Sequence, residues 1–203
     1  MKICSDCVRH CGVQRPDTLH GEGVFGFCRC PRNPVVARAA LHRWEEPCIS
    51  GTRGSGTVFF SGCNLRCVFC QNYEISSGLQ GREITVGRLR GIYGELIAQG
   101  AHNINLVTPG HYTEAILESL KEPLPVPVVY NSNGYDDLEQ LRRLEGKIQI
   151  YLPDFKYAGN ALAERYSHAP DYFETASAAI QEMFRQCGPY VIGGDGMMKS
   201  GVI

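Results

Sequence analysis

Ten cysteines are unevenly distributed over the 203 residues, and their spacing constrains the chain more than any other feature. Six of them fall into two tight clusters, at Cys4, Cys7 and Cys11 and at Cys63, Cys67 and Cys70. Disulfide bonds rarely need such short spacings, whereas a metal ion or an iron–sulfur cluster needs several thiolates that converge on a small volume. The spacing therefore predicts that each cluster binds metal.

Charge and hydropathy narrow the setting in which these cysteines work. Twenty Lys and Arg residues oppose 21 Asp and Glu residues, so there is no basic excess and we expect no nucleic acid partner. The N-terminus carries no apolar segment, and no run approaches ~20 apolar residues. We therefore expect a cytoplasmic protein with no signal peptide and no membrane contact. Because a reducing cytoplasm does not sustain a disulfide framework, metal binding is the expected use of the clustered thiols.

The pattern of the chain changes near residue 54. Residues 1–54 are rich in Cys, Gly, Pro and Arg without a sustained hydrophobic period, which predicts a small loop module held together by metal. From 55 to 203, apolar runs alternate with helical patterns, such as the one that Thr85 caps and Gly100 ends. The expected strands are 56–62, 103–108, 126–131 and 148–152. This alternation predicts an α/β domain of parallel strands, closed as a barrel or left as an open sheet.

Residues suited to chemistry follow each of the four expected strands. They are Cys63, Cys67 and Cys70 after the first, Thr108 to His111 after the second, Asn131 to Gly134 after the third, and Asp154 with Lys156 after the fourth. Parallel α/β folds place their active sites at the carboxyl ends of the strands. We therefore expect these residues to share one rim of the sheet.

The segment CNLRCVFC at 63–70 resembles the cluster-binding motif of the radical S-adenosylmethionine (SAM) superfamily. The strings EEPCISGTRGSGTVFFSGCNLRCVFCQN, NINLVTPGHY and VVYNSNGY are similar to pyruvate formate-lyase-activating-enzyme-like proteins. The resemblance covers nearly the whole chain and implies a partial (βα) barrel of the radical SAM type, C-terminally truncated, with a small N-terminal Cys-rich metal module. It also implies that Cys63, Cys67 and Cys70 hold three irons of a [4Fe–4S] cluster and leave the fourth iron free for SAM.

The same resemblance implies an enzyme that reductively cleaves SAM to methionine and a 5'-deoxyadenosyl radical, which abstracts hydrogen from a substrate. Phe69 matches the aromatic position that lies against the adenine. Asp154 and Lys156 match a segment near the methionine end of SAM, where Lys156 would neutralise carboxylate charge. The cofactor-binding residues implied in this way are Phe69, Asn72, Thr108, His111, Asn131, Ser132, Asp154 and Lys156.

One segment departs from the family pattern. Activating enzymes carry a G-G-E segment after the second strand, where this chain has Thr108-Pro109-Gly110-His111 and so lacks the acidic side chain. His111 is a candidate catalytic residue, as a proton carrier or a substrate ligand. The alternative is a histidine at a helix start that is satisfied by its neighbours, and the sequence favours neither.

The N-terminal cysteines form a second expected site. The set Cys4, Cys7, Cys11 and Cys28 is expected to bind zinc in a closed structural site, and an auxiliary iron–sulfur cluster that relays electrons is the alternative. Cys30 has no partner at ligand spacing and is expected to be inert. The string LHRWEE at 41–46 is expected to cap the rim of the barrel.

The resemblance implies a glycyl radical enzyme as the protein substrate and a flavodoxin- or ferredoxin-type electron donor. Two alternatives stay open: a radical SAM enzyme that acts on a small molecule, and a non-enzymatic iron–sulfur or zinc module that transfers electrons or acts as a scaffold. A full (βα) barrel takes ~250 residues, and 198–203 has the pattern of a fifth strand that has only begun. We therefore expect a truncated barrel with an unpaired edge beside the fourth strand.

Overall fold

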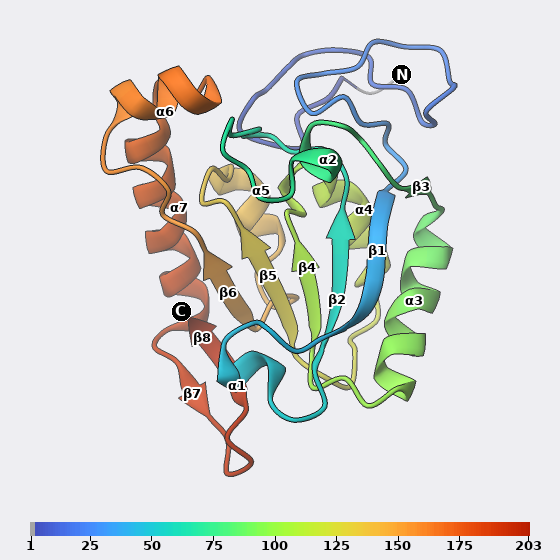
Figure 1. Ribbon diagram of the computed structural model, residues 1–203, viewed down its shortest axis with the longest axis vertical. Coiled ribbons are helices and arrows are strands. Elements are labelled where there is room, and N and C mark those ends of the chain that lie inside the picture. Colours follow the sequence, from blue (N-terminus) through green and yellow to red (C-terminus); the bar gives the residue numbers. More distant parts are fainter. Residues whose placement is uncertain (1–2) are drawn as a thin grey trace.

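The computed structural model describes residues 3–203, which form one eight-stranded sheet with helices packed against it (Figure 1). The strands are β1 (Val35–His42), β2 (Ser55–Phe60), β3 (Arg82–Glu83), β4 (Ile104–Val107), β5 (Val128–Ser132), β6 (Ile150–Pro153), β7 (Val191–Ile192) and β8 (Met198–Val202). The helical elements are α1 (Pro47–Ser50), α2 (Tyr73–Ser76), α3 (Val86–Ala98), η1 (Gly110–Tyr112), α4 (Thr113–Ser119), α5 (Leu138–Arg143), α6 (Asn160–Ser167) and α7 (Tyr172–Cys187).

The centre of the sheet is parallel. β2, β4, β5, β6 and β8 are paired in parallel in that order, and the first four are the strands expected from the sequence. Helices separate them along the chain, so the predicted α/β fold of parallel strands is confirmed. The full strand order runs β3-β1-β2-β4-β5-β6-β8-β7. Because β3 and β7 end the order without pairing to each other, the sheet is open rather than a closed barrel.

Helix α3 shows how local sequence fixes an element that supports the sheet. The Thr85 hydroxyl accepts a hydrogen bond from the Arg88 backbone N–H at 3.1 Å, which satisfies one of the free donors at the helix start. Gly100 takes a left-handed φ of 93° just beyond the helix end, where glycine has no steric penalty. The buried face of α3 consists of Leu89, Ile92, Tyr93 and Leu96, which belong to the main hydrophobic core. The predicted start and stop are both confirmed.

One strand lies inside the segment that was expected to contain only loops. β1 pairs antiparallel with β2 and, at its other edge, with the short β3. The expectation of a loop module over all of residues 1–54 is therefore wrong for Val35–His42, which belongs to the sheet. The sequence VVARAALH does not alternate between buried and exposed positions, because only Val35 and Val36 are buried. A strand of this kind carries no period-2 signal.

The edge beyond β6 also differs from expectation. β8 pairs with β6 in parallel, which confirms that 198–203 contributes a strand, and its other edge pairs antiparallel with β7. The expected unpaired edge beside the fourth strand is thus occupied by a small hairpin. Its turn includes Gly196, at a left-handed φ of 75°, and the Gly196 N–H donates to the Gly193 carbonyl at 2.9 Å.

The remaining N-terminal loops lie over the carboxyl ends of the parallel strands, at the top of Figure 1. At the opposite end, α1 brings Ile49 into a small core with Val129, Ile150 and Met198. A small apolar cluster thus lies between α1 and the sheet, and a larger one lies between the sheet and the helices that pack against it. Within residues 3–203, none of the helices has the length and apolar character needed to span a membrane.

Candidate functional site

A cavity of about 830 Å³ lies at the carboxyl ends of the parallel strands. Nearly all the residues singled out from the sequence line it. They are Cys63, Cys67, Phe69, Cys70, Asn72, Thr108, Asn131, Ser132, Asp154 and Lys156. The four strand ends lie far apart in the chain, from Phe60 at the end of β2 to Pro153 at the end of β6, and all contribute to one cavity, which is the shared rim that parallel topology predicts.

The loop that carries the three cysteines leaves β2 through Gly62. This glycine has a left-handed φ of 78°, and a Cβ added to it would overlap the Cys30 Sγ and lie 2.8 Å from the Cys28 carbonyl oxygen. No larger residue fits between the strand end and the N-terminal loops. Gly62 therefore sets where the chain turns into the cysteine loop.

Cys63, the first cysteine of the loop, is buried at the edge of the cavity. Its Sγ accepts hydrogen bonds from the backbone N–H groups of Leu65 at 3.3 Å and Arg66 at 3.4 Å, and from the Asn133 side-chain amide at 3.3 Å. Burial raises the pKa of the Cys63 thiol to about 11, and these donors oppose the shift because they favour the thiolate. Burial therefore outweighs the three donors and favours the neutral thiol, while the donors remain placed to bond to a thiolate at this position.

The donor set is compatible with an iron–sulfur cluster. Cys63 and Cys67 are buried and Cys70 is half-buried, and all three line the cavity. Among residues 3–203, no group of three or more His, Cys, Asp or Glu side chains is arranged to hold one metal ion. A [4Fe–4S] cluster binds its thiolates on different irons, so the three sulfurs do not have to meet at a single point.

A polar wall faces the cysteine loop. The Lys156 ammonium forms an ion pair with the Asp154 carboxylate at 2.6 Å, and the Lys156 backbone N–H donates to the Tyr172 hydroxyl at 2.8 Å. The Ser132 hydroxyl donates to Asp136 at 2.5 Å and accepts from the Gly134 N–H at 2.9 Å. Lys156 therefore offers a cation at the cavity, whereas Ser132 mainly holds its own loop.

Thr108 and Asn131, two further residues predicted from the sequence, line the cavity next to these groups. Thr108 has a left-handed φ of 57°, which β-branched residues rarely adopt, and its N–H donates to the Asn131 carbonyl at 2.8 Å. The Asn131 side-chain amide donates to the Glu45 carboxylate at 3.4 Å. Strained backbone of this kind is concentrated at functional sites.

The LHRWEE segment borders the cavity beside Asn131 and Asp154. His42, Trp44, Glu45 and Glu46 all border the cavity, and the Trp44 side chain is 89% exposed there. Burial raises the pKa of Glu45, and the neighbouring Glu46 and Asp154 raise it further. This side of the cavity is thus acidic and carries one large exposed aromatic ring.

His111 does not belong to the cavity. Its side chain is fully buried, its Nε2 lies 2.9 Å from the Ser61 carbonyl oxygen, and it is absent from the lining. Burial and the nearby Arg15 guanidinium lower its pKa to about 3, so the ring is neutral and Nε2 donates to Ser61. His111, predicted to bind the cofactor or to act as a proton carrier or substrate ligand, thus lies outside the cavity that the other predicted residues line. It holds the strand end of β2 in place.

The four N-terminal cysteines lie together. Cys4, Cys7 and Cys28 are buried and Cys11 is half-buried. Burial raises the pKa of the Cys7 thiol, and the nearby sulfurs of Cys28, Cys4 and Cys11 raise it further. The Cys11 Sγ also accepts a hydrogen bond from the Phe27 N–H at 3.3 Å. The chain therefore gathers these thiols in one region, although no three of them are close enough to hold an ion as they stand.

Cys30 has a structural role that its sequence context did not indicate. The side chain is fully buried, and its Sγ donates to the Ser61 carbonyl at 3.2 Å and the Cys28 carbonyl at 3.3 Å. It thus lies between the N-terminal thiols and the turn that precedes Cys63. A contact between residues 31 positions apart gives no signal in sequence spacing.

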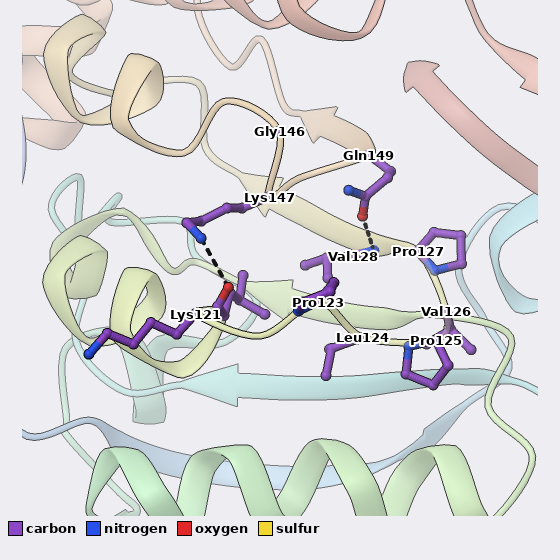
Figure 2. A pocket seen from close by; sticks show the side chains of 11 residues that line it. Lys121, Pro123, Leu124, Pro125, Val126, Pro127, Val128, Gly146, Lys147 and Gln149 are labelled. Carbon is purple, nitrogen blue, oxygen red and sulfur yellow. Dashed lines mark hydrogen bonds between the residues drawn. The ribbon is translucent and has the colours of Figure 1, made fainter.

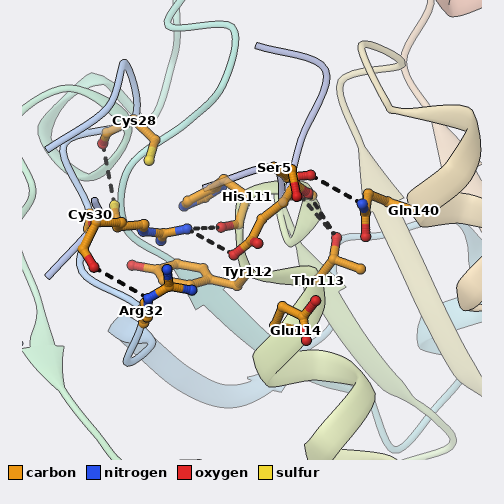
Figure 3. A network of polar contacts seen from close by, with 12 residues as sticks. Ser5, Cys28, Cys30, Arg32, His111, Tyr112, Thr113, Glu114 and Gln140 are labelled. Atoms are coloured by element: carbon orange, nitrogen blue, oxygen red, sulfur yellow. Dashed lines mark hydrogen bonds and ion pairs between the residues drawn. The ribbon is translucent and has the colours of Figure 1, made fainter. Parts of the chain in front are cut away.

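A buried ion pair fastens the same junction. The Arg15 guanidinium lies 3.1 Å from the Asp6 carboxylate and donates to the carbonyl oxygens of Cys30 and His111, each at 2.7 Å. Figure 3 shows this network between the N-terminal loops and η1, with Cys28 and Cys30 at one side and Gln140 at the other. Arginine was not singled out from the sequence here, because nothing local distinguishes Arg15 from the exposed arginines.

A second cavity, of about 370 Å³, lies at the amino ends of β5 and β6 (Figure 2). It is bordered by Pro123, Pro125, Pro127 and neighbouring apolar residues, and the Lys147 ammonium at its edge donates to the Leu120 carbonyl at 3.0 Å. Catalytic groups in parallel α/β folds lie at the other end of the strands. The larger cavity is therefore the candidate functional site.

No family model matches this chain. The chain is 34% identical over 182 residues to the uncharacterized protein MJ0674 of Methanocaldococcus jannaschii, an alignment that covers 85% of this chain and 51% of that protein. The chain thus spans about half the length of the curated relative it matches.

Proposed function

We propose that this chain is a radical SAM enzyme. Cys63, Cys67 and Cys70 would hold a [4Fe–4S] cluster, which on reduction supplies the electron that cleaves SAM to methionine and a 5'-deoxyadenosyl radical. One observation carries the proposal: three cysteines of a single loop share a cavity with polar residues from three other strand ends. Among the described residues that line it, there are three cysteines and no fourth, which is the donor set that leaves one iron for SAM.

The residues around the cysteines have the chemistry that SAM requires. The Lys156 ammonium borders the cavity in an ion pair with Asp154, and it would neutralise the carboxylate of the methionine end when SAM is bound. Phe69 is 57% exposed, and its ring makes an edge contact with Tyr157 at 5.9 Å between centroids, so one face is free for an adenine to stack on. Asn131 and Thr108 add amide and hydroxyl groups at the floor.

The proposal extends to the substrate and to the electron donor. A glycyl radical enzyme is the proposed source of the hydrogen atom, and a flavodoxin- or ferredoxin-type protein is the proposed source of the electron. In support, the cavity opens to the surface beside the exposed Trp44, so a loop of a partner protein has a route to it. The N-terminal cysteines are proposed as a separate zinc site that fixes the loops over the strand ends.

The test is anaerobic reconstitution of the protein with iron and sulfide, reduction with dithionite, and chromatographic measurement of 5'-deoxyadenosine from added SAM. We expect about four irons per chain at this site and SAM-dependent product, both lost in Cys67→Ala. Cys187→Ala is the matched control, because Cys187 lies on α7 away from the cavity and is half-buried. Full iron content and product from Cys67→Ala would overturn the proposal.

A further inference from the structure

Asn133 occupies a fixed position beside the first cysteine. It follows β5 and is 8% exposed, and its amide nitrogen lies 3.3 Å from the Cys63 Sγ and 2.9 Å from the Asn64 Oδ1. Its own Oδ1 accepts the Tyr135 N–H at 2.9 Å. Because the oxygen of the amide is engaged by a donor and the nitrogen by an acceptor, the N–H group is held toward the sulfur.

The surrounding contacts make this arrangement stiff. The Asn64 amide, which is 2% exposed, donates to the Tyr135 carbonyl at 2.6 Å. The loop after β5 and the cysteine loop after β2 are thus joined by a closed set of side-chain and backbone bonds. Of the three donors to the Cys63 sulfur, two are backbone N–H groups, and Asn133 is the one that a substitution can remove.

We propose that Asn133 is a positioning residue that sets the reduction potential of a cluster bound through Cys63. This inference rests on the proposed function. An N–H donor beside a cluster thiolate favours the more negative, reduced state of the cluster, because it interacts more strongly as electron density on the sulfur increases. Removing the donor leaves the reduced cluster less stable, so its midpoint potential falls.

Two substitutions separate the lost hydrogen bond from other effects. Asn133→Leu removes the donor without adding charge. Asn133→Asp keeps the size of the side chain and the acceptor for the Tyr135 N–H, and it replaces the donor by a carboxylate. The matched control is Asn64→Ala, which removes the acceptor Asn64 Oδ1 but keeps the bond from the Tyr135 N–H to the Asn133 oxygen, so one of the two contacts that hold the Asn133 amide beside the sulfur remains.

The measurement is an anaerobic redox titration of each reconstituted protein without SAM, followed by visible absorbance and electron paramagnetic resonance, with iron and sulfide analysis alongside. We expect Asn133→Leu to shift the ratio of reduced to oxidised cluster about tenfold at a given potential, which is a fall of about 59 mV for one electron. Asn133→Asp should fall further, and Asn64→Ala should match the wild type.

The possible failures are distinguishable. A wild-type protein that takes up no cluster overturns the proposed function. Wild-type potentials in loaded Asn133→Leu and Asn133→Asp overturn the role of Asn133 and leave the proposed function intact. An equal fall in Asn64→Ala also overturns that role, since loosening the loop would then suffice. If Asn133→Leu loads poorly, the loaded fraction of Asn133→Asp decides the question through the same titration.

Discussion

The Arg9 guanidinium donates a 2.7 Å hydrogen bond to the carbonyl oxygen of Asn64, the residue that follows Cys63. Arg9 lies between Cys7 and Cys11 in the chain, so this bond joins the two cysteine clusters. The same group donates to the Ser167 carbonyl at 2.9 Å and lies 4.0 Å from the centre of the Phe27 ring. One side chain therefore connects the N-terminal loops, the cysteine loop and the end of α6.

Replacing Arg9 should loosen this junction. We expect Arg9→Met to lower the free energy of unfolding by about 2 kcal/mol, because hydrogen bonds from a charged donor to buried carbonyls are lost. Urea denaturation gives the value. Arg142→Met is the control. The Arg142 side chain is 62% exposed and its ion pair with Glu182 is long, at 3.9 Å, so its loss should change stability little. Equal effects of the two variants would contradict the role given to Arg9.

The turn into the cysteine loop can be tested at Gly62, with Gly146 as a control that has a similar backbone conformation elsewhere in the chain. Both have a left-handed φ, of 78° and 77°, but a Cβ at Gly146 meets no atom within 4 Å. Gly146→Ala should therefore cost about 1 kcal/mol from backbone conformation alone. Gly62→Ala should cost about 2 kcal/mol more, because its Cβ would overlap Cys30, and thermal unfolding followed by circular dichroism measures both. A smaller loss for Gly62→Ala would show that the N-terminal loops are not seated as described.

Burial of neutral His111 predicts a pH dependence of stability. Its pKa is lowered from 6.5 to about 3 in the folded protein, so between these values the unfolded chain binds a proton that the folded chain does not. Stability should therefore fall as pH falls through this window, on the order of 1 kcal/mol per pH unit from this group. Urea midpoints of the wild type and His111→Gln, measured from pH 7 to pH 4, test this. Parallel curves for the two proteins would be inconsistent with a neutral buried ring.

The N-terminal thiols should bind metal independently of the cavity. Protein purified in air is expected to carry about one zinc per chain by elemental analysis, and Cys7→Ser should lose it, because three thiolates no longer close the site. A triple replacement of Cys63, Cys67 and Cys70 should retain the zinc. Iron in place of zinc in that triple variant would favour the electron-relay alternative.

Lys156 should contribute to binding of SAM. We expect Lys156→Met to weaken equilibrium binding of SAM to the cluster-loaded protein about tenfold, because a cation beside the carboxylate is lost. Lys199→Met serves as the control, since Lys199 forms a surface ion pair with Asp195 and does not border the cavity. Calorimetry under anaerobic conditions gives both constants, and unchanged affinity in Lys156→Met would place the carboxylate elsewhere.

Much of the fold followed from local patterns. Apolar runs and helix signals, such as Thr85 before α3, predicted the parallel strands and their connections. Once parallel topology was assumed, the rim that collects Cys63, Thr108, Asn131 and Lys156 followed as well, because strand ends meet at one edge. These inferences depend on periodicity and on chain direction, which a sequence contains in full.

Other features depend on contacts between distant segments. β1 was missed because its side chains do not alternate between buried and exposed, so its pairing with β2 and β3 is what identifies it as a strand. His111 and Lys156 both follow strands, yet packing by Arg15 and Ser61 buries the first, while the second borders the cavity.

The cysteine loop shows the same division. The spacing of Cys63, Cys67 and Cys70 predicted that the three thiols lie close together, because a short spacing limits how far they can separate, and all three line the cavity. Only the tertiary structure decided that Asn133 donates to one of these sulfurs and that Arg9 holds the residue beside it. Hydrogen bonds form wherever folding brings a donor to an acceptor, and that placement depends on every element between them in the chain.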